Sequence, residues 1–141
     1  MQAMTPDEIA AFLGAGTRTA KVATVRADGR PHVAPVWFLP DGDQLIFMTW
    51  HTTVKAANIR RDGRVAVTVD DEAPPFAYVV VEGVASLSDD AAEIRTWAER
   101  IAARYVGPDQ AAAYGERNGV AGELVVRVSP TRTVAHKGIA D

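Results

Sequence analysis

The strongest constraint on the fold is a series of short alternating segments separated by tight-turn sequences. Residues 19–25 (TAKVATV) and 32–39 (HVAPVWFL) flank Ala27-Asp28-Gly29-Arg30. An Asp-Gly pair between alternating segments is a strong indicator of a β-hairpin. Pro40-Asp41-Gly42-Asp43 is a second turn sequence, and it leads into residues 44–50 (QLIFMTW). The first half of the chain is therefore expected to form an antiparallel sheet.

Three later segments are also typical of strands: 65–69 (VAVTV), 76–87 (FAYVVVEGVASL) and 124–128 (LVVRV), the last extended or paired by 131–136. Gly83 predicts a bulge or a barrel corner. A short helix is expected to begin after Thr5, and a longer one to run from Ser88 to about Tyr105. Residues 110–119 are expected to add a short helical piece. Several antiparallel strands with few helices predict a mainly β protein, a six-stranded antiparallel barrel with peripheral helices. We expect a single domain over residues 1–141.

Composition argues against several classes of protein and site. A net charge of -3 argues against a general nucleic-acid binder. The absence of cysteine excludes disulfides, Cys-ligated zinc and a thiol nucleophile. The three histidines are widely spaced, so we expect no metal site. No apolar run approaches the ~20 residues of a membrane span, and the acidic N-terminus is unlike a secretion signal. The cytoplasm is the expected location.

Residues 51–64 (HTTVKAANIRRDGR) form a basic segment in this acidic chain, with Lys55, Arg60, Arg61 and Arg64 against Asp62. The pattern predicts a short helix capped by Thr52 or Thr53 and ending at Gly63. Its first turn carries Lys55 and no acid, the reverse of what the helix dipole favours. Free N–H groups, hydroxyls and an ammonium at one point suit a bound phosphate. The alternative is that Lys55 is a solvated helix lysine.

Three pieces in order resemble the flavin-binding split-barrel family related to pyridoxamine 5'-phosphate oxidase, and within it the branch that uses the deazaflavin coenzyme F420. They are ATVRADGRPHVAPVWF, the Thr-x-Lys-x-x-Asn-Ile spacing from Thr53 to Ile59, and RRDGRVAVTVDD followed by VVEGVASL. The resemblance covers roughly residues 19–87. It implies a six-stranded split barrel of the FMN-binding type that forms a homodimer with two cofactors in grooves between the subunits.

The resemblance also implies a cofactor site. Thr53, Lys55 and the backbone N–H of Val54 would hold the phosphate. Four residues on adjacent strands would line the ring and ribityl groove: Val36, Trp37, Met48 and Thr49. Phe76 and Tyr78 would reach the partner subunit's cofactor. Trp37 is alternatively a core or interface aromatic residue.

The chain departs from the oxidase pattern at two places. Val54 stands where the oxidase has an arginine, and the C-terminal TRTVAHKGIAD lacks a Trp–Arg-rich segment. Vitamin B6 oxidation is therefore not expected. Arg60 and Arg61, with Arg64, favour the longer anion of F420 over FMN, although Arg60 and Arg61 alternatively complement the helix C-terminus.

No acid–base pair or catalytic side chain is evident in the sequence, which suits chemistry carried by a cofactor. We expect an F420-dependent reductase that transfers a hydride to a small unsaturated organic substrate. The alternatives are an FMN-dependent oxidase or flavin reductase of the same fold, and a non-catalytic cofactor carrier.

Overall fold

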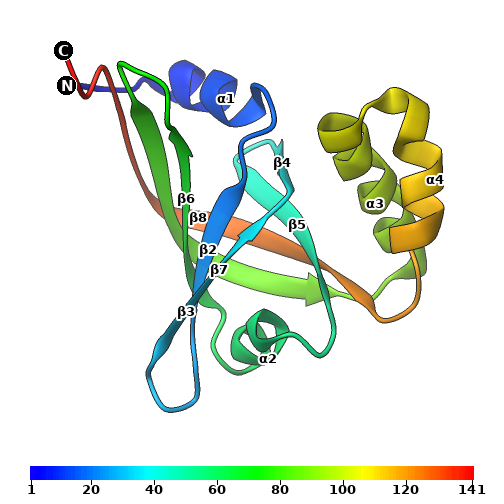
Figure 1. Ribbon diagram of the computed structural model, residues 1–141. Helices are drawn as coiled ribbons and strands as arrows, with labels where there is room; N and C mark the ends of the chain where they lie inside the picture. Colours follow the sequence, from blue (N-terminus) through cyan, green and yellow to red (C-terminus); the bar gives the residue numbers. More distant parts are fainter.

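A computed structural model describes all of residues 1–141 (Figure 1). Its centre is one antiparallel sheet in the order β3-β2-β6-β7-β8-β5-β4, with β1 paired to β8. The strands are β1 Gln2–Ala3, β2 Ala20–Val25, β3 Pro31–Val36, β4 Phe38–Asp41, β5 Gln44–Trp50, β6 Arg64–Asp71, β7 Ala77–Ser88 and β8 Glu123–Lys137. The helices are α1 Pro6–Gly14, α2 Val54–Arg61, α3 Ala91–Val106 and α4 Pro108–Asn118.

The chain connectivity forces this sheet to curve. Strands β3 and β4 lie at the two opposite ends of the strand order, yet only Trp37 separates them in the chain. A flat sheet of this width could not bring its two ends to neighbouring residues, so the sheet curls into a half-barrel. The predicted mainly β split barrel with peripheral helices is confirmed.

The predicted strand at residues 32–39 is wrong as a single element. Residues up to Val36 pair with β2, whereas residues from Phe38 pair with β5. One continuous strand could not serve both ends of the curved sheet, so the backbone breaks at Trp37. This break and the two-residue β1 raise the count from the six strands expected to eight.

Strand β8 joins the two segments expected at 124–128 and 131–136 into one element. It pairs with β5 through its first half and with β7 along most of its length. The register shifts between Glu82 and Gly83, which confirms the predicted bulge. A Cβ on Gly83 would lie 2.5 Å from the Ser129 carbonyl oxygen, so the two backbones approach too closely for a side chain.

Local sequence explains the turns and helix starts. Gly29 (φ 88°) and Gly42 (φ 61°) adopt left-handed conformations in the β2–β3 and β4–β5 hairpins, where glycine is free of strain. Thr5 and Glu8 form the predicted capping box of α1. Asp90 caps α3, and the Asp90 side chain accepts a hydrogen bond from the Glu93 N–H. The piece expected at 110–119 is the three-turn helix α4.

Two apolar clusters hold these elements together. The barrel interior contains Phe38, Phe47, Leu13 of α1, Ile59 of α2 and the inward-facing valines Val22, Val65, Val67, Val69, Val79, Val81, Val126 and Val128. The second cluster lies outside the barrel, where Ile94, Trp97 and Ile101 of α3 pack on Ile46 and Val125. Figure 1 accordingly shows the α3–α4 pair to one side of the sheet, with α1 and α2 at opposite ends. None of the four helices has the length and apolar content needed to cross a bilayer.

Candidate functional site

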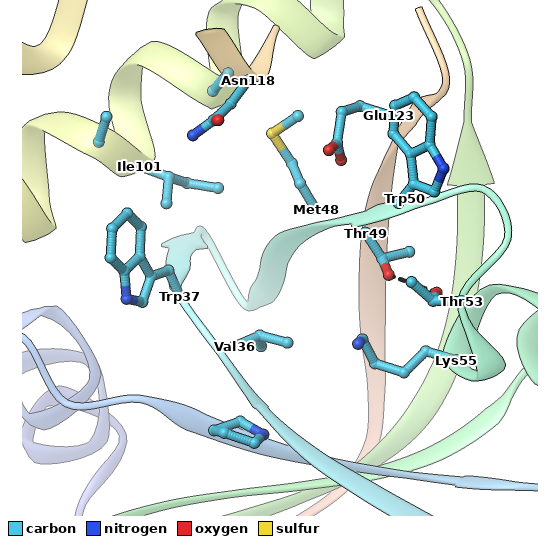
Figure 2. A pocket seen from close by; sticks show the side chains of 13 residues that line it. Val36, Trp37, Met48, Thr49, Trp50, Thr53, Lys55, Ile101, Asn118 and Glu123 are labelled. Atoms are coloured by element: carbon cyan, nitrogen blue, oxygen red, sulfur yellow. Dashed lines mark hydrogen bonds between the residues drawn. The ribbon is translucent and has the colours of Figure 1, made fainter. Parts of the chain in front are cut away.

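A cavity of about 410 Å³, here called the groove, opens between the β3–β4 junction, β5, the start of α2 and the α3–α4 pair (Figure 2). Seven of its 13 lining residues are hydrophobic. This mixture suits a ligand with a flat apolar part and a charged part. The lining residues are Pro35, Val36, Trp37, Met48, Thr49, Trp50, Thr53, Lys55, Ala98, Ile101, Ala102, Asn118 and Glu123.

One end of the groove is built to meet an anion. Thr53 caps α2, and its hydroxyl accepts a hydrogen bond from the Ala56 N–H at 3.2 Å. The same hydroxyl lies 2.7 Å from the Thr49 hydroxyl on β5, which ties the helix start to the sheet. The N–H groups of Val54 and Lys55 occupy the first helical turn and have no intrahelical acceptor. Hydroxyl groups and free backbone N–H groups therefore meet at the N-terminus of α2.

The Lys55 ammonium is half-buried beside these donors and forms no ion pair or hydrogen bond within the protein. Partial burial lowers the pKa of Lys55, and no carboxylate counteracts this effect. The other two lysines are paired, Lys21 with Asp70 and Lys137 with Glu8. An unpaired cation at a helix N-terminus is a suitable contact for a phosphate group.

Trp37 forms an aromatic wall whose orientation is fixed from behind. Its ring stacks on Tyr105 of α3, with centroids 5.0 Å apart and planes 2° from parallel. The Tyr105 hydroxyl donates to the Arg18 carbonyl at 2.7 Å and accepts from the Phe38 N–H at 3.2 Å. Trp37 is nonetheless 39% exposed, so a large aromatic surface stays available to a ligand.

The structure brings six of the nine predicted cofactor residues together in the groove: Val36, Trp37, Met48, Thr49, Thr53 and Lys55. The side chain of Val54 is exposed outside it. Arg60 donates to the His51 carbonyl at 2.9 Å and lines a neighbouring cavity, while Arg61 donates to the Val25 carbonyl. These two arginines therefore do not line the groove.

The remaining predicted contacts also lie elsewhere in the subunit. Arg64 is exposed and pairs with Asp62, which holds the pKa of that carboxyl at about 2. Phe76 precedes β7 and is 39% exposed, and the Tyr78 hydroxyl lies 3.0 Å from Nδ1 of His136. None of the three lines the groove of its own subunit.

Sequence reasoning missed the wall made by α3, α4 and the start of β8. Ile101 contributes apolar surface there, and Asn118 and Glu123 contribute polar groups. Trp50 was also missed as a lining residue. It pairs with Glu123 across β5 and β8. Only the pairing of β5 with β8 brings these residues to the groove, and no local sequence pattern encodes a pairing across more than seventy residues.

The fold agrees with a comparison of sequences. The profile of the family described as pyridoxamine 5'-phosphate oxidase matches residues 5–136 of the chain, nearly its whole length. The chain belongs to the pyridoxamine 5'-phosphate oxidase family. Membership in this family confirms the resemblance found in the sequence. A comparison with functionally curated proteins gave no match.

Solved structures with this family's fold cover most of the chain. A conserved hypothetical protein from Mycobacterium tuberculosis is 26% identical with a TM-score of 0.84, over 96% of this chain and 86% of that chain. A structure named F420 reductase is 28% identical with a TM-score of 0.69, over 86% and 92% of the two chains. An FAD-binding protein from Mycobacterium smegmatis shares the fold at 20% identity and a TM-score of 0.65, over 96% and 98%.

Proposed function

We propose that this protein is an F420-dependent oxidoreductase that reduces a small unsaturated organic substrate with a hydride. The observation that carries the proposal is the unpaired, half-buried Lys55 ammonium at a helix N-terminus, inside a groove walled by Trp37. A cofactor with a flat ring and a phosphate has the two parts that such a groove accommodates. The 28% identity to a structure named F420 reductase supports the deazaflavin as this cofactor.

The residues of the groove fit the parts of this cofactor. Lys55, the Thr53 hydroxyl and the Val54 N–H would bind the phosphate, because they are donors without a protein anion beside them. Val36, Trp37 and Met48 would flank the ring, with Thr49 beside the ribityl chain. The reduced deazaflavin supplies the hydride. The protein orients the cofactor ring against the substrate and keeps water away from it.

The acidic tail of F420 is a secondary part of the proposal. Arg60 and Arg61 were expected to contact it, and Arg60 lines a cavity that shares Glu123 with the groove. If Arg60 binds the tail, Arg60→Ala should weaken binding of F420 and leave binding of a tail-free deazaflavin unchanged. Equal effects on both ligands, or no effect on either, would remove Arg60 from the site.

Turnover tests the proposed reaction. Purified protein is mixed with reduced F420 and a panel of small conjugated carbonyl compounds, and the return of oxidised F420 absorbance is followed. The proposal predicts oxidation that depends on both enzyme and substrate. A yellow protein that retains flavin and does not bind F420 would instead indicate an FMN-dependent enzyme. Tight F420 binding without any turnover would indicate a non-catalytic carrier.

A further inference from the structure

Glu123, the first residue of β8, carries a carboxyl group that the proposed cofactor contacts do not use. It lines the groove and also the adjoining cavity that contains His51 and Arg60. The side chain is partly buried, accepts no hydrogen bond and forms no ion pair within the protein. Figure 2 shows it between Met48 and Trp50, apart from Lys55.

The backbone at Glu123 is held in place by its neighbours. Glu123 pairs with Trp50 across β5 and β8, and its N–H donates to the Val120 carbonyl at 3.1 Å. Gly122 has φ +103°, and a Cβ there would lie 2.3 Å from the Trp50 ring, so the ring packs directly on this turn. The His51 N–H closes the turn by donating to the Gly122 carbonyl at 2.8 Å. The Glu123 side chain therefore starts from a backbone position that these contacts fix.

The surroundings of Glu123 make its ionisation less favourable than in water. Burial raises the pKa of this carboxyl above its ordinary value. The charged or titratable groups that share its two cavities are Lys55, His51, Arg60 and Asp89, and none is within ion-pair distance of it. By contrast, Glu93 is hydrogen bonded by Ser88 and Arg127, and its pKa is lowered.

We propose that Glu123 is the proton donor of the reduction, and that its part of the groove receives the substrate. This inference rests on the proposed function, because reduction of a carbon–carbon double bond by a hydride also consumes a proton. The groove then has two chemically different ends, with the cation of Lys55 for the cofactor phosphate and the acid of Glu123 for the substrate.

The step balances for an α,β-unsaturated carbonyl substrate. The β-carbon receives the hydride and forms a new C–H bond, the C=C π bond breaks, and the electron pair moves to the α-carbon and the carbonyl oxygen. The α-carbon then takes the proton from the Glu123 carboxyl, which becomes a carboxylate. The substrate is reduced by two electrons, the deazaflavin is oxidised, and solvent returns the proton to Glu123.

Two measurements on Glu123→Gln test the role. In the cofactor-free protein, NMR titration of side-chain carboxyl carbons should show one signal that titrates above the ordinary glutamate range and disappears in the variant. In the F420-loaded enzyme, turnover of the variant should fall, because a positioned general acid contributes ~10²–10⁴-fold. The wild-type rate should decrease as pH rises through the Glu123 pKa, and the variant should lack this decrease.

Glu72→Gln is the matched control, since Glu72 is exposed in the turn before β7 and does not line the groove. It should leave rate and pH profile unchanged. A normal Glu123 titration, a variant within twofold of wild type, or a variant that loses F420 affinity would each overturn the proton-donor role. Wild-type protein that neither binds nor oxidises F420 would overturn the proposed function itself, and the inference with it.

Discussion

Lys55 places an ammonium group at the start of α2 without an anionic partner in the protein. Because its pKa is lowered on folding, the charged side chain is less stable in the folded chain than in the unfolded one. This cost persists at any pH below the folded-state pKa and disappears as the side chain loses its proton. A residue that opposes folding and faces a groove is typical of a binding site.

Lys55→Met should therefore separate binding from stability. Removing a charge-assisted contact worth ~1.5–3 kcal/mol should weaken F420 binding by about 10- to 100-fold. The free energy of unfolding should not decrease, because no partner is lost. Fluorescence titration and urea denaturation measure the two effects. Lys21→Met, which removes a lysine paired with Asp70 outside the groove, should leave affinity unchanged; a Lys55 variant with wild-type affinity would contradict the assignment.

Asn58 shows why the Thr-x-Lys-x-x-Asn-Ile spacing includes an asparagine. It is buried, and its Nδ2 donates at 2.9 Å to the hydroxyl of Thr24, which is buried on β2. This bond joins α2 to the sheet and so fixes the helix start that carries Lys55. The sequence contained the residue, but only the fold reveals its partner thirty-four positions away.

Asn58→Ala should lower the free energy of unfolding by ~1–3 kcal/mol, because it leaves the Thr24 hydroxyl buried without a partner. The double variant Asn58→Ala/Thr24→Val removes both polar groups and should lose less than the sum of the single changes. Denaturation in urea gives all three values. Strictly additive losses would mean that the two side chains are not coupled.

At the scale of elements, the sequence predicted those parts that local patterns encode. The Asp-Gly hairpins, the strand at Gln44–Trp50, the α1 capping box and the bulge at Gly83 all depend on residues near one another in the chain. The break at Trp37 and the Glu123 wall depend on which distant strands pair. Six of nine predicted cofactor residues line the groove, where the β3–β4 junction, β5 and the start of α2 come together.

The bulge at Gly83 leaves no room for a side chain. Gly83→Ala would place a Cβ 2.5 Å from the Ser129 carbonyl oxygen, so β7 and β8 must move apart. We expect a loss of stability larger than the ~1 kcal/mol typical of point substitutions, seen as a lower thermal midpoint. Gly14→Ala is the control, since a Cβ there meets nothing within 4 Å. Equal midpoints for both variants would contradict the close approach.

For the whole molecule, we propose the homodimer that the resemblance implied. Apolar side chains are exposed on the β2–β3 hairpin and on β7, with Val33 65% exposed and Val84 49% exposed. Together with Val25, Val65 and Ala66, Val84 lines an apolar surface cavity between β2, β6 and β7. Apolar surface of this kind is typical of an interface between subunits.

Light scattering should give twice the 15.1 kDa of one chain. Val33→Asp should shift the protein toward monomer if the hairpin lies in the interface, because a carboxylate would lose its hydration there. Val33→Thr keeps the shape of the side chain without a charge and should stay dimeric. A wild-type mass of 15.1 kDa would contradict the dimer.

The central claim is that the groove at Lys55 binds the deazaflavin coenzyme through its phosphate. Parallel titrations of the wild-type protein with F420 and with FMN, followed by cofactor fluorescence, test it most directly. We expect saturable binding of F420 at micromolar concentration, weaker binding of FMN, and a large loss of F420 affinity in Lys55→Met. Failure of F420 to saturate the protein, or binding that is unaffected by Lys55→Met, would contradict it.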